Sequence, residues 1–185
     1  MKFAILVPTE FEAQLVSDEV KNKELFMISG ILKTTTKNII RLIEQENVEK
    51  VILIGFAGDL KSTNRIGKVL SISSVTNKKE IINLKTLKGL KVDTASCITV
   101  WKPVYSEKIK KELSTHAELV EMECFWAAQA CHENNVEFHS LRIISDSCDT
   151  SLSDYFSFKK RATPNLLKAQ NSLKDTVNSI IELLS

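Results

Sequence analysis

Residues 51–59 read Val51-Ile52-Leu53-Ile54-Gly55-Phe56-Ala57-Gly58-Asp59, four apolar side chains followed by a glycine-rich end. An unbroken apolar run of this length is typical of a strand that is covered on both faces, as in α/β proteins. The glycines predict that the strand stops at Ile54 and that the chain turns there. Another apolar run lies at residues 2–7, and residues 138–144 read as a further buried strand, so the sequence predicts a sheet with a buried centre.

Helical patterns separate the apolar runs. Apolar residues recur at helical spacing in residues 10–21, 33–46, 105–113, 121–134 and 162–184. Shorter strand patterns cover residues 25–28, 67–75, 80–84, 96–100 and 117–120. Strands alternating with helices favour an α/β fold, here a three-layer sandwich with a central mixed sheet flanked by helices. No repeat, low-complexity tract or linker interrupts residues 1–185, so we predict a single domain.

The composition is that of an ordinary globular protein. Of the 185 residues, 43% are hydrophobic and 26% are charged, which excludes a disordered tail and a disulfide-stapled mini-protein. No apolar run approaches the roughly 20 residues that span a bilayer. The apolar start at residues 2–7 is too short for a signal peptide. We therefore expect a cytoplasmic protein with no membrane partner.

Charge is unevenly distributed along the chain. The formal net charge is +2, yet residues 60–111 hold 12 Lys and Arg against 3 Asp and Glu. Such a stretch could attract nucleic acid, but no aromatic residue on which a base could stack lies between Phe56 and Trp101. A solvated face of lysines is the better interpretation, and we predict no nucleic-acid partner.

The four cysteines, Cys97, Cys124, Cys131 and Cys148, form no CxxC pair. Free, buried thiols are the expected state for cysteines in such a pattern. Cys131 and the two histidines nearest to it lack the spacing of a structural zinc site. We expect neither a metal ion nor a cofactor.

Acidic residues follow the ends of the predicted strands. Ligands of open α/β sheets gather at the carboxyl ends of the strands, and the polar residues in such places include Glu10, Glu12, Glu121, Glu123, Ser145 and Asp146. Each alone has an ordinary structural explanation, such as a first-turn acid or an N-cap. Together they predict a cluster of carboxylates at one edge of the sheet. A pair of carboxyl groups, one protonated and one ionised, is how glycosidic bonds are cleaved.

Three blocks of the sequence resemble one family. The blocks are Val120-Glu121-Met122-Glu123, Ala130-Cys131-His132-Glu133-Asn134-Asn135-Val136-Glu137-Phe138 and Arg142-Ile143-Ile144-Ser145-Asp146. They resemble the signature of the methylthioadenosine/S-adenosylhomocysteine nucleosidases, parts of which the wider nucleoside phosphorylase and futalosine hydrolase superfamily shares. Glu12 and the segment Phe56-Ala57-Gly58 fit the same pattern. The resemblance covers most of the chain and implies a nucleoside-phosphorylase-like fold.

The resemblance implies hydrolysis of the N-glycosidic bond of a purine nucleoside. Asp146 looks like the general acid that protonates N7 of the purine as the bond to the sugar breaks. Glu12 matches the residue that positions and deprotonates the attacking water. Arg142 resembles the partner that helps to orient that water. A small-molecule nucleoside is the implied substrate, and no cofactor is implied.

The resemblance also implies the contacts to the substrate. Glu123 would accept hydrogen bonds from the ribose hydroxyls, while Met122 would pack against the sugar and the base. Ala57 and Gly58 would let the backbone approach the nucleoside. Two further substrate contacts are expected at Phe56 and Ser145. Trp101 matches a base-contacting position and could stack on the purine; a half-buried aromatic at the pocket rim is the alternative.

The sequence also departs from the family pattern. The chain looks like a shortened member, with segments missing between Leu25 and Gly30 and between Gly58 and Trp101. Phe56 stands where serine or threonine is usual, as in members that resemble futalosine hydrolases. The 5′ substituent of the substrate therefore stays open, and so does its base.

Three functions remain in view. A nucleosidase is favoured over a nucleoside phosphorylase, because residues 8–12 supply no basic side chain that could bind phosphate. A trimmed, non-catalytic module that binds nucleosides is the third reading. The resemblance further implies a homodimer.

Overall fold

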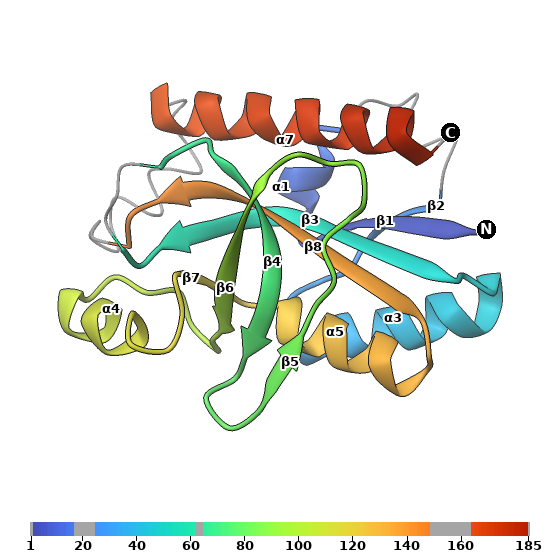
Figure 1. The fold of residues 1–185 in the computed structure, drawn as a ribbon, viewed down its shortest axis with the longest axis horizontal. Helices are drawn as coiled ribbons and strands as arrows, with labels where there is room; N and C mark the ends of the chain where they lie inside the picture. The colour runs from blue at the N-terminus through green and yellow to red at the C-terminus, as the bar shows by residue number, and fades with distance from the viewer. Residues whose placement is uncertain (1, 17–24, 62–64, 149–163, 185) are drawn as a thin grey trace.

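Helices lie on both faces of a mixed β-sheet (Figure 1). The computed structural model describes residues 2–16, 25–61, 65–148 and 164–184. The strands in these ranges are β1 (Phe3–Val7), β2 (Leu25–Ile28), β3 (Lys50–Asp59), β4 (Val69–Thr76), β5 (Ile81–Asn83), β6 (Asp93–Thr99), β7 (Leu119–Glu121) and β8 (Glu137–Asp146). The helices are α1 (Glu10–Ala13), α3 (Lys33–Glu46), α4 (Glu107–Leu113), α5 (Cys124–Glu133) and α7 (Pro164–Leu184).

The strand pairing places β3 and β8 at the centre. β1 pairs in parallel with β2 and β3, and β3 pairs in parallel with β8 along its whole length. β8 also pairs antiparallel with β4, which pairs in parallel with β6. β6 pairs in parallel with β7, and β7 returns antiparallel to β3. The predicted central mixed sheet is confirmed, and the pairings β3–β7–β6–β4–β8 close part of it into a ring.

The two helical layers are those of the predicted three-layer sandwich. α7 lies across one face of the sheet with the short α1 beside it, and α3 and α5 lie on the opposite face (Figure 1). Leu173, Val177 and Ile180 of α7 are buried in one apolar cluster with Ile5 of β1 and Ile52 of β3. This burial stabilises the sheet because apolar side chains leave water on both sides of β3.

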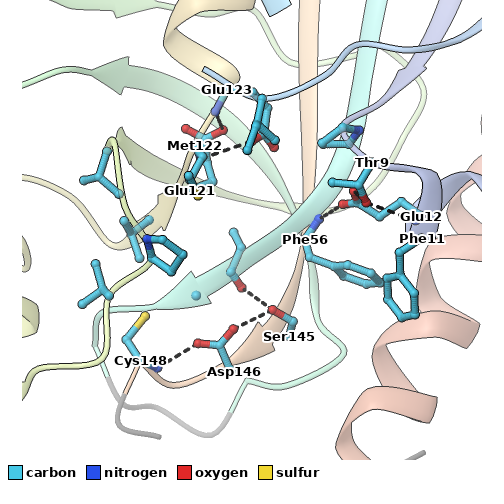
Figure 2. Close-up of a pocket in the computed structure, with 18 of the residues that line it drawn as sticks. Thr9, Phe11, Glu12, Phe56, Glu121, Met122, Glu123, Ser145, Asp146 and Cys148 are labelled. Carbon is cyan, nitrogen blue, oxygen red and sulfur yellow. Dashed lines mark hydrogen bonds between the residues drawn. The ribbon is translucent and has the colours of Figure 1, made fainter. Parts of the chain in front are cut away.

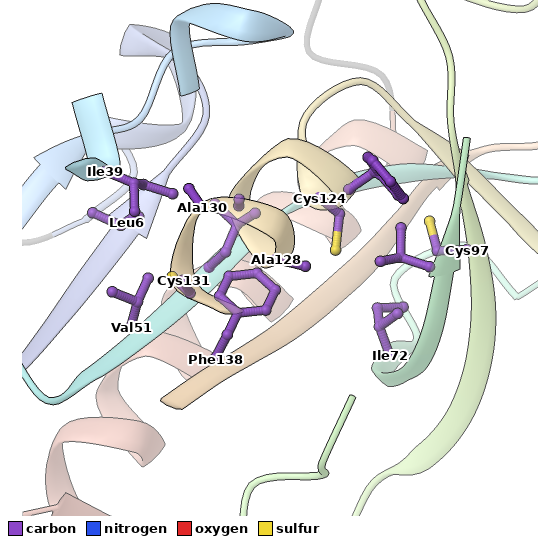
Figure 3. Packing of buried hydrophobic residues seen from close by; sticks show 14 of the residues in the cluster. Leu6, Ile39, Val51, Ile72, Cys97, Cys124, Ala128, Ala130, Cys131 and Phe138 are labelled. Carbon is purple, nitrogen blue, oxygen red and sulfur yellow. The ribbon is translucent and has the colours of Figure 1, made fainter. Parts of the chain in front are cut away.

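Small side chains dominate the buried surface of α5. Ala128, Ala130 and Cys131 of this helix are buried in a second cluster that includes Val51 and Phe138 from the sheet (Figure 3). Residues without long side chains let the helix lie close to the sheet, where packing is as dense as in an organic crystal. The close approach fixes the N-terminus of α5 beside the carboxyl end of β7.

Three predicted boundaries near this end of the sheet are wrong. β3 does not stop at Ile54 but continues through the glycines to Asp59. Glycine serves close packing there, because a Cβ at Gly55 would come within 3.0 Å of three side-chain atoms. The helix predicted from residue 121 begins at Cys124, because residues 119–121 extend the sheet as β7. The helix predicted over residues 10–21 ends at Ala13, and residues 17–21 lie outside the described ranges.

All four cysteines are buried and unpaired, as the sequence predicts. Among the described residues, none of the helices combines the length and the hydropathy needed to span a bilayer.

Candidate active site

A pocket of about 210 Å³ opens at the carboxyl ends of β1, β3 and β8 (Figure 2). The described residues that line it are Pro8, Thr9, Phe11, Glu12, Ile31, Phe56, Ala57, Gly58, Val100, Pro103, Val104, Tyr105, Val120, Glu121, Met122, Glu123, Ser145, Asp146 and Cys148. The structure thus brings Glu12, Glu121, Glu123 and Asp146 together at one edge of the sheet. Glu10 is exposed and does not line the pocket.

Asp146 ends β8 and is held at both carboxylate oxygens. The hydroxyl of Ser145 donates to Oδ2 at 2.8 Å, and the backbone N–H of Cys148 donates to Oδ1 at 3.0 Å (Figure 2). Gly58, on the neighbouring strand, leaves room for this arrangement. A Cβ there would overlap the sulfur of Cys148 and lie 3.1 Å from Oδ1 of Asp146. Glycine at residue 58 is therefore required mainly by the space that the Cys148 side chain occupies, with Asp146 the next nearest neighbour.

Glu12 lies in the first turn of α1, just after β1, and its carboxyl is buried. The hydroxyl of Thr9 donates to Oε2 at 2.6 Å, and the backbone N–H of Phe56 donates to Oε1 at 2.9 Å (Figure 2). Burial raises the pKa of Glu12, although these two hydrogen bonds and the charge of Arg142 oppose the rise. A carboxylate with a raised pKa is a stronger base, which suits a group that must take a proton from water.

Arg142 is fully buried on β8 and binds two carboxylates. Its Nη1 lies 2.7 Å from Oε1 of Glu123, and its Nη2 lies 2.9 Å from Oε2 of Glu121. Burial alone would lower the pKa of Arg142, but the carboxylates of Glu123 and Glu121 raise it, so the guanidinium stays charged. Arg142 does not line the pocket; it lies behind the acids and supports them.

Glu123 immediately precedes α5 and is buried beside Met122. The backbone N–H of Met122 donates to its Oε2 at 3.2 Å. Burial raises the pKa of Glu123 to about 8; the charge of Arg142 opposes this rise, and the charges of Glu121 and Glu12 add to it. Near neutral pH this carboxyl therefore takes up and releases a proton readily.

The structure brings most of the predicted substrate contacts to the pocket. The predicted contacts that line it are Met122, Glu123, Phe56, Ala57, Gly58 and Ser145. Trp101 does not line it and is 54% exposed. The ring centroids of Trp101 and Trp126 lie 5.2 Å apart, and Nζ of Lys33 lies 5.8 Å from the ring centroid of Trp101. Trp101 therefore lies on the surface outside the pocket.

Sequence reasoning missed one apolar wall of the pocket. This wall follows the carboxyl end of β6 and consists of Val100, Pro103, Val104 and Tyr105. The signal was available, because the rule that ligands gather beyond strand ends applies to residues 100–105 as well. The predicted contact in that segment is Trp101, its largest aromatic side chain, whereas these four neighbours line the pocket.

The pocket combines acids with apolar walls. The described residues that line it include no Lys, Arg or His. Among the described residues, no group of three His, Cys, Asp or Glu side chains has the arrangement of a metal site. The chemistry that these side chains can supply is proton transfer by carboxyl groups and hydrogen bonding to a neutral, partly apolar ligand.

Solved structures share this fold. The chain matches the futalosine hydrolase mutant of Helicobacter pylori with a TM-score of 0.78 and 18% identity, over 97% of this chain and 99% of that one. The 5′-methylthioadenosine/S-adenosylhomocysteine nucleosidase of Campylobacter jejuni matches with a TM-score of 0.80 and 18% identity, over 100% and 98% of the two chains. The corresponding nucleosidase of H. pylori, with butyl-thio-DADMe-Immucillin-A, gives 0.77 and 20%, over 97% and 98%.

The sequence comparisons give one family. A search of curated proteins found no significant match. The family model of the phosphorylase superfamily matches residues 80–178, which is more than half of the chain and includes Glu121, Glu123, Arg142 and Asp146. The fold agrees with this match, since it is that of the nucleosidases and the futalosine hydrolase above. The chain therefore belongs to the phosphorylase superfamily.

Proposed function

We propose that the protein is a nucleosidase that hydrolyses the N-glycosidic bond of a purine nucleoside, of the 5′-methylthioadenosine, S-adenosylhomocysteine or futalosine type. One observation carries the proposal: the pocket is lined by four carboxyl groups and, among the described residues, by no cationic side chain. Phosphate would bring negative charge into a cavity of acids, whereas water would not. Hydrolysis is therefore favoured over phosphorolysis.

Asp146 is the proposed general acid. A purine is a poor leaving group until N7 accepts a proton, so a carboxyl group must face the base. The hydrogen bonds from Ser145 and Cys148 hold the Asp146 side chain in one orientation. The apolar side chains of Val104 and Tyr105 line the same pocket and offer the base a surface to pack on.

Glu12 is the proposed base for the water. As the bond to the purine breaks, positive charge develops on the sugar, and a water must attack its other face. Glu12 would take the proton of that water. Thr9 and the backbone of Phe56 hold the carboxylate in place, and the charge of Arg142 lies behind it. In its ionised form, Glu123 would accept hydrogen bonds from the ribose hydroxyls beside Met122.

The test is release of free base, followed by chromatography. Methylthioadenosine, adenosylhomocysteine, futalosine, adenosine and inosine are incubated with the protein, with and without phosphate. We expect release that does not depend on phosphate and that disappears in Asp146→Asn, which keeps the shape of the side chain. Release that requires phosphate would make the protein a phosphorylase. Binding of a nucleoside without release would leave a non-catalytic module.

We also propose that the protein works as a homodimer in the cytoplasm. The exposed Ile31 at the pocket and the exposed Trp101 outside it offer apolar surface to a second copy of the chain. Four unpaired cysteines suit a reducing compartment. A monomer by light scattering would contradict the first statement, and cell fractionation would test the second.

A further inference from the structure

Glu121 accepts four hydrogen bonds in the site, although the proposed reaction gives it no role. Its Oε2 accepts from the backbone N–H of Glu123 at 2.8 Å, from the backbone N–H of Cys124 at 2.6 Å and from Arg142 at 2.9 Å. Its Oε1 accepts from the hydroxyl of Thr99. Its side chain is 1% exposed. A carboxylate bonded in this way is fixed in position.

Glu121 also determines where Arg142 points. One end of the guanidinium binds Glu121 and the other binds Glu123, and two such bonds fix the plane of the group. Nη1 then faces Gly55. A Cβ at Gly55 would lie 2.6 Å from Nη1 of Arg142 and 2.9 Å from Oε1 of Glu12. Arg142 therefore lies near Glu12, whose pKa its charge lowers, while it binds Glu123 directly.

These buried side chains form a cluster with more acidic groups than cationic ones. Glu12, Glu121 and Glu123 are all buried, and Arg142 is the cation that faces them. Full ionisation would leave uncompensated negative charge away from water, which is costly. The two buried thiols beside the cluster, Cys97 and Cys124, do not add to this excess, because burial raises the pKa of each and favours the neutral thiol. The raised pKa of Glu123 fits this excess: burial is its main cause, and the neighbouring charges of Glu121 and Glu12 add to it.

We propose that Glu121 is a positioning residue that holds Arg142 against Glu123 and near Glu12 and sets, through its own charge, the pH at which Glu123 becomes a ribose-binding carboxylate. The ribose contact rests on the proposed function; the charge coupling between Glu121 and Glu123 does not. The two parts can therefore be tested separately.

Glu121→Gln removes the negative charge of residue 121 and keeps the shape of its side chain. The amide oxygen can still accept the bonds of Oε2, and the amide NH₂ can donate to Thr99, so the start of α5 is kept. Protein labelled with ¹³C at the glutamate side-chain carboxyls is titrated by NMR, and Glu123→Gln identifies the signal of Glu123. We expect the titration midpoint of Glu123 to fall by about 1 pH unit or more in Glu121→Gln, because a like charge has been removed. An unchanged midpoint would overturn the proposal.

Thr99→Val is the matched control. It removes the hydroxyl that donates to Glu121 and accepts the backbone N–H of Phe125, but it leaves every charge in place. We expect a less stable protein in which the titration midpoint of Glu123 moves by less than half of the shift in Glu121→Gln. An equal shift would mean that packing, and not the charge of Glu121, controls Glu123.

The same variants are then compared by steady-state kinetics. In the wild type, kcat/KM should rise with pH as Glu123 ionises, and Glu121→Gln should move this rise to lower pH, with a larger effect on KM than on kcat. If the wild type releases no base while the NMR shift is present, the proposed function fails and the charge coupling stands. If base is released and neither the NMR midpoint nor the rise moves, the role of Glu121 is refuted.

Discussion

Replacing Gly55 by alanine tests whether this glycine is needed for packing in the site. The added Cβ would lie 2.6 Å from Nη1 of Arg142, 2.8 Å from Cγ of Pro8 and 2.9 Å from Oε1 of Glu12. None of the three atoms can yield easily, because two belong to buried, hydrogen-bonded charged groups and one belongs to a ring. Overpacking of this kind costs about 1–3 kcal/mol, which for a chain of this length lowers the unfolding midpoint by about 2–12 °C.

In Gly55→Ala, the loss of activity should be larger than the loss of folding stability alone would cause. The methyl group displaces both Arg142 and Glu12, and a shift of about 1 Å in a reacting group costs on the order of 100-fold in rate. The assay is kcat/KM for base release together with thermal unfolding of the same preparation. We expect a protein that is folded at 25 °C and has lost about 100-fold in kcat/KM.

Gly67→Ala is the control for general destabilisation. Gly67 has a φ of +82°, and a Cβ there would meet the flexible side chain of Lys168. Left-handed backbone costs an L-residue about 1–2 kcal/mol, so the loss of stability should be similar while Glu12 and Arg142 stay in place. Full activity in Gly55→Ala, or an equal loss of activity in Gly67→Ala, would refute the reasoning.

Three further predictions concern charge and packing. Glu12→Gln should lower kcat by about 10²–10⁴-fold. The variant should keep its thermal stability, because the amide oxygen can still accept a hydrogen bond from the backbone N–H of Phe56 and the buried group no longer ionises. Burial raises the pKa of Glu123 to about 8 from 4.5, so the stability contributed by its neutral form is complete below about pH 4.5 and is lost as the pH rises through about 8. The midpoint temperature of thermal unfolding should therefore decrease when the pH is raised from about 5 to about 9. Glu123→Gln should reduce this decrease, and an equal decrease in the variant would contradict the assignment. Phe125→Ala should cost about 3–5 kcal/mol in urea unfolding, because this ring is 1% exposed between α5 and the sheet; a cost below about 1 kcal/mol would mean that the core collapses into the gap.

Periodicity alone predicts the layers of the molecule. The helix expected over residues 33–46 is α3 (Lys33–Glu46), because its apolar stripe is regular and its ends carry no competing signal. The apolar run at residues 2–7 is β1, and the strand predicted over residues 138–144 is β8. The carboxyl ends of these strands then place Glu12 and Asp146 together.

Packing decides what periodicity could not predict. The glycines at residues 55 and 58 predict a turn by their usual preference. In the structure, however, a side chain at residue 55 would collide with Arg142, and one at residue 58 would collide with Cys148. The burial of Arg142 behind the pocket was equally hidden, because its position depends on contacts with β7 and α5 that are far away in sequence. Trp101 is a different case: its large aromatic ring predicted a ligand contact, but in the structure the neighbouring Val100 and Pro103 line the cavity and Trp101 does not.

The parallel pairing of β3 with β8 has a consequence for how the protein comes into being. The register sets Gly55 opposite Arg142 and brings Gly58 alongside Asp146. A chain made from its N-terminus completes β3 well before β8 exists, so the growing protein holds Glu12 but neither Arg142 nor Asp146. Contacts between residues so distant in sequence form slowly. Until β8 docks, β3 offers an apolar edge open to other chains. The candidate site is therefore completed late in biogenesis, in the step that also covers this edge of β3.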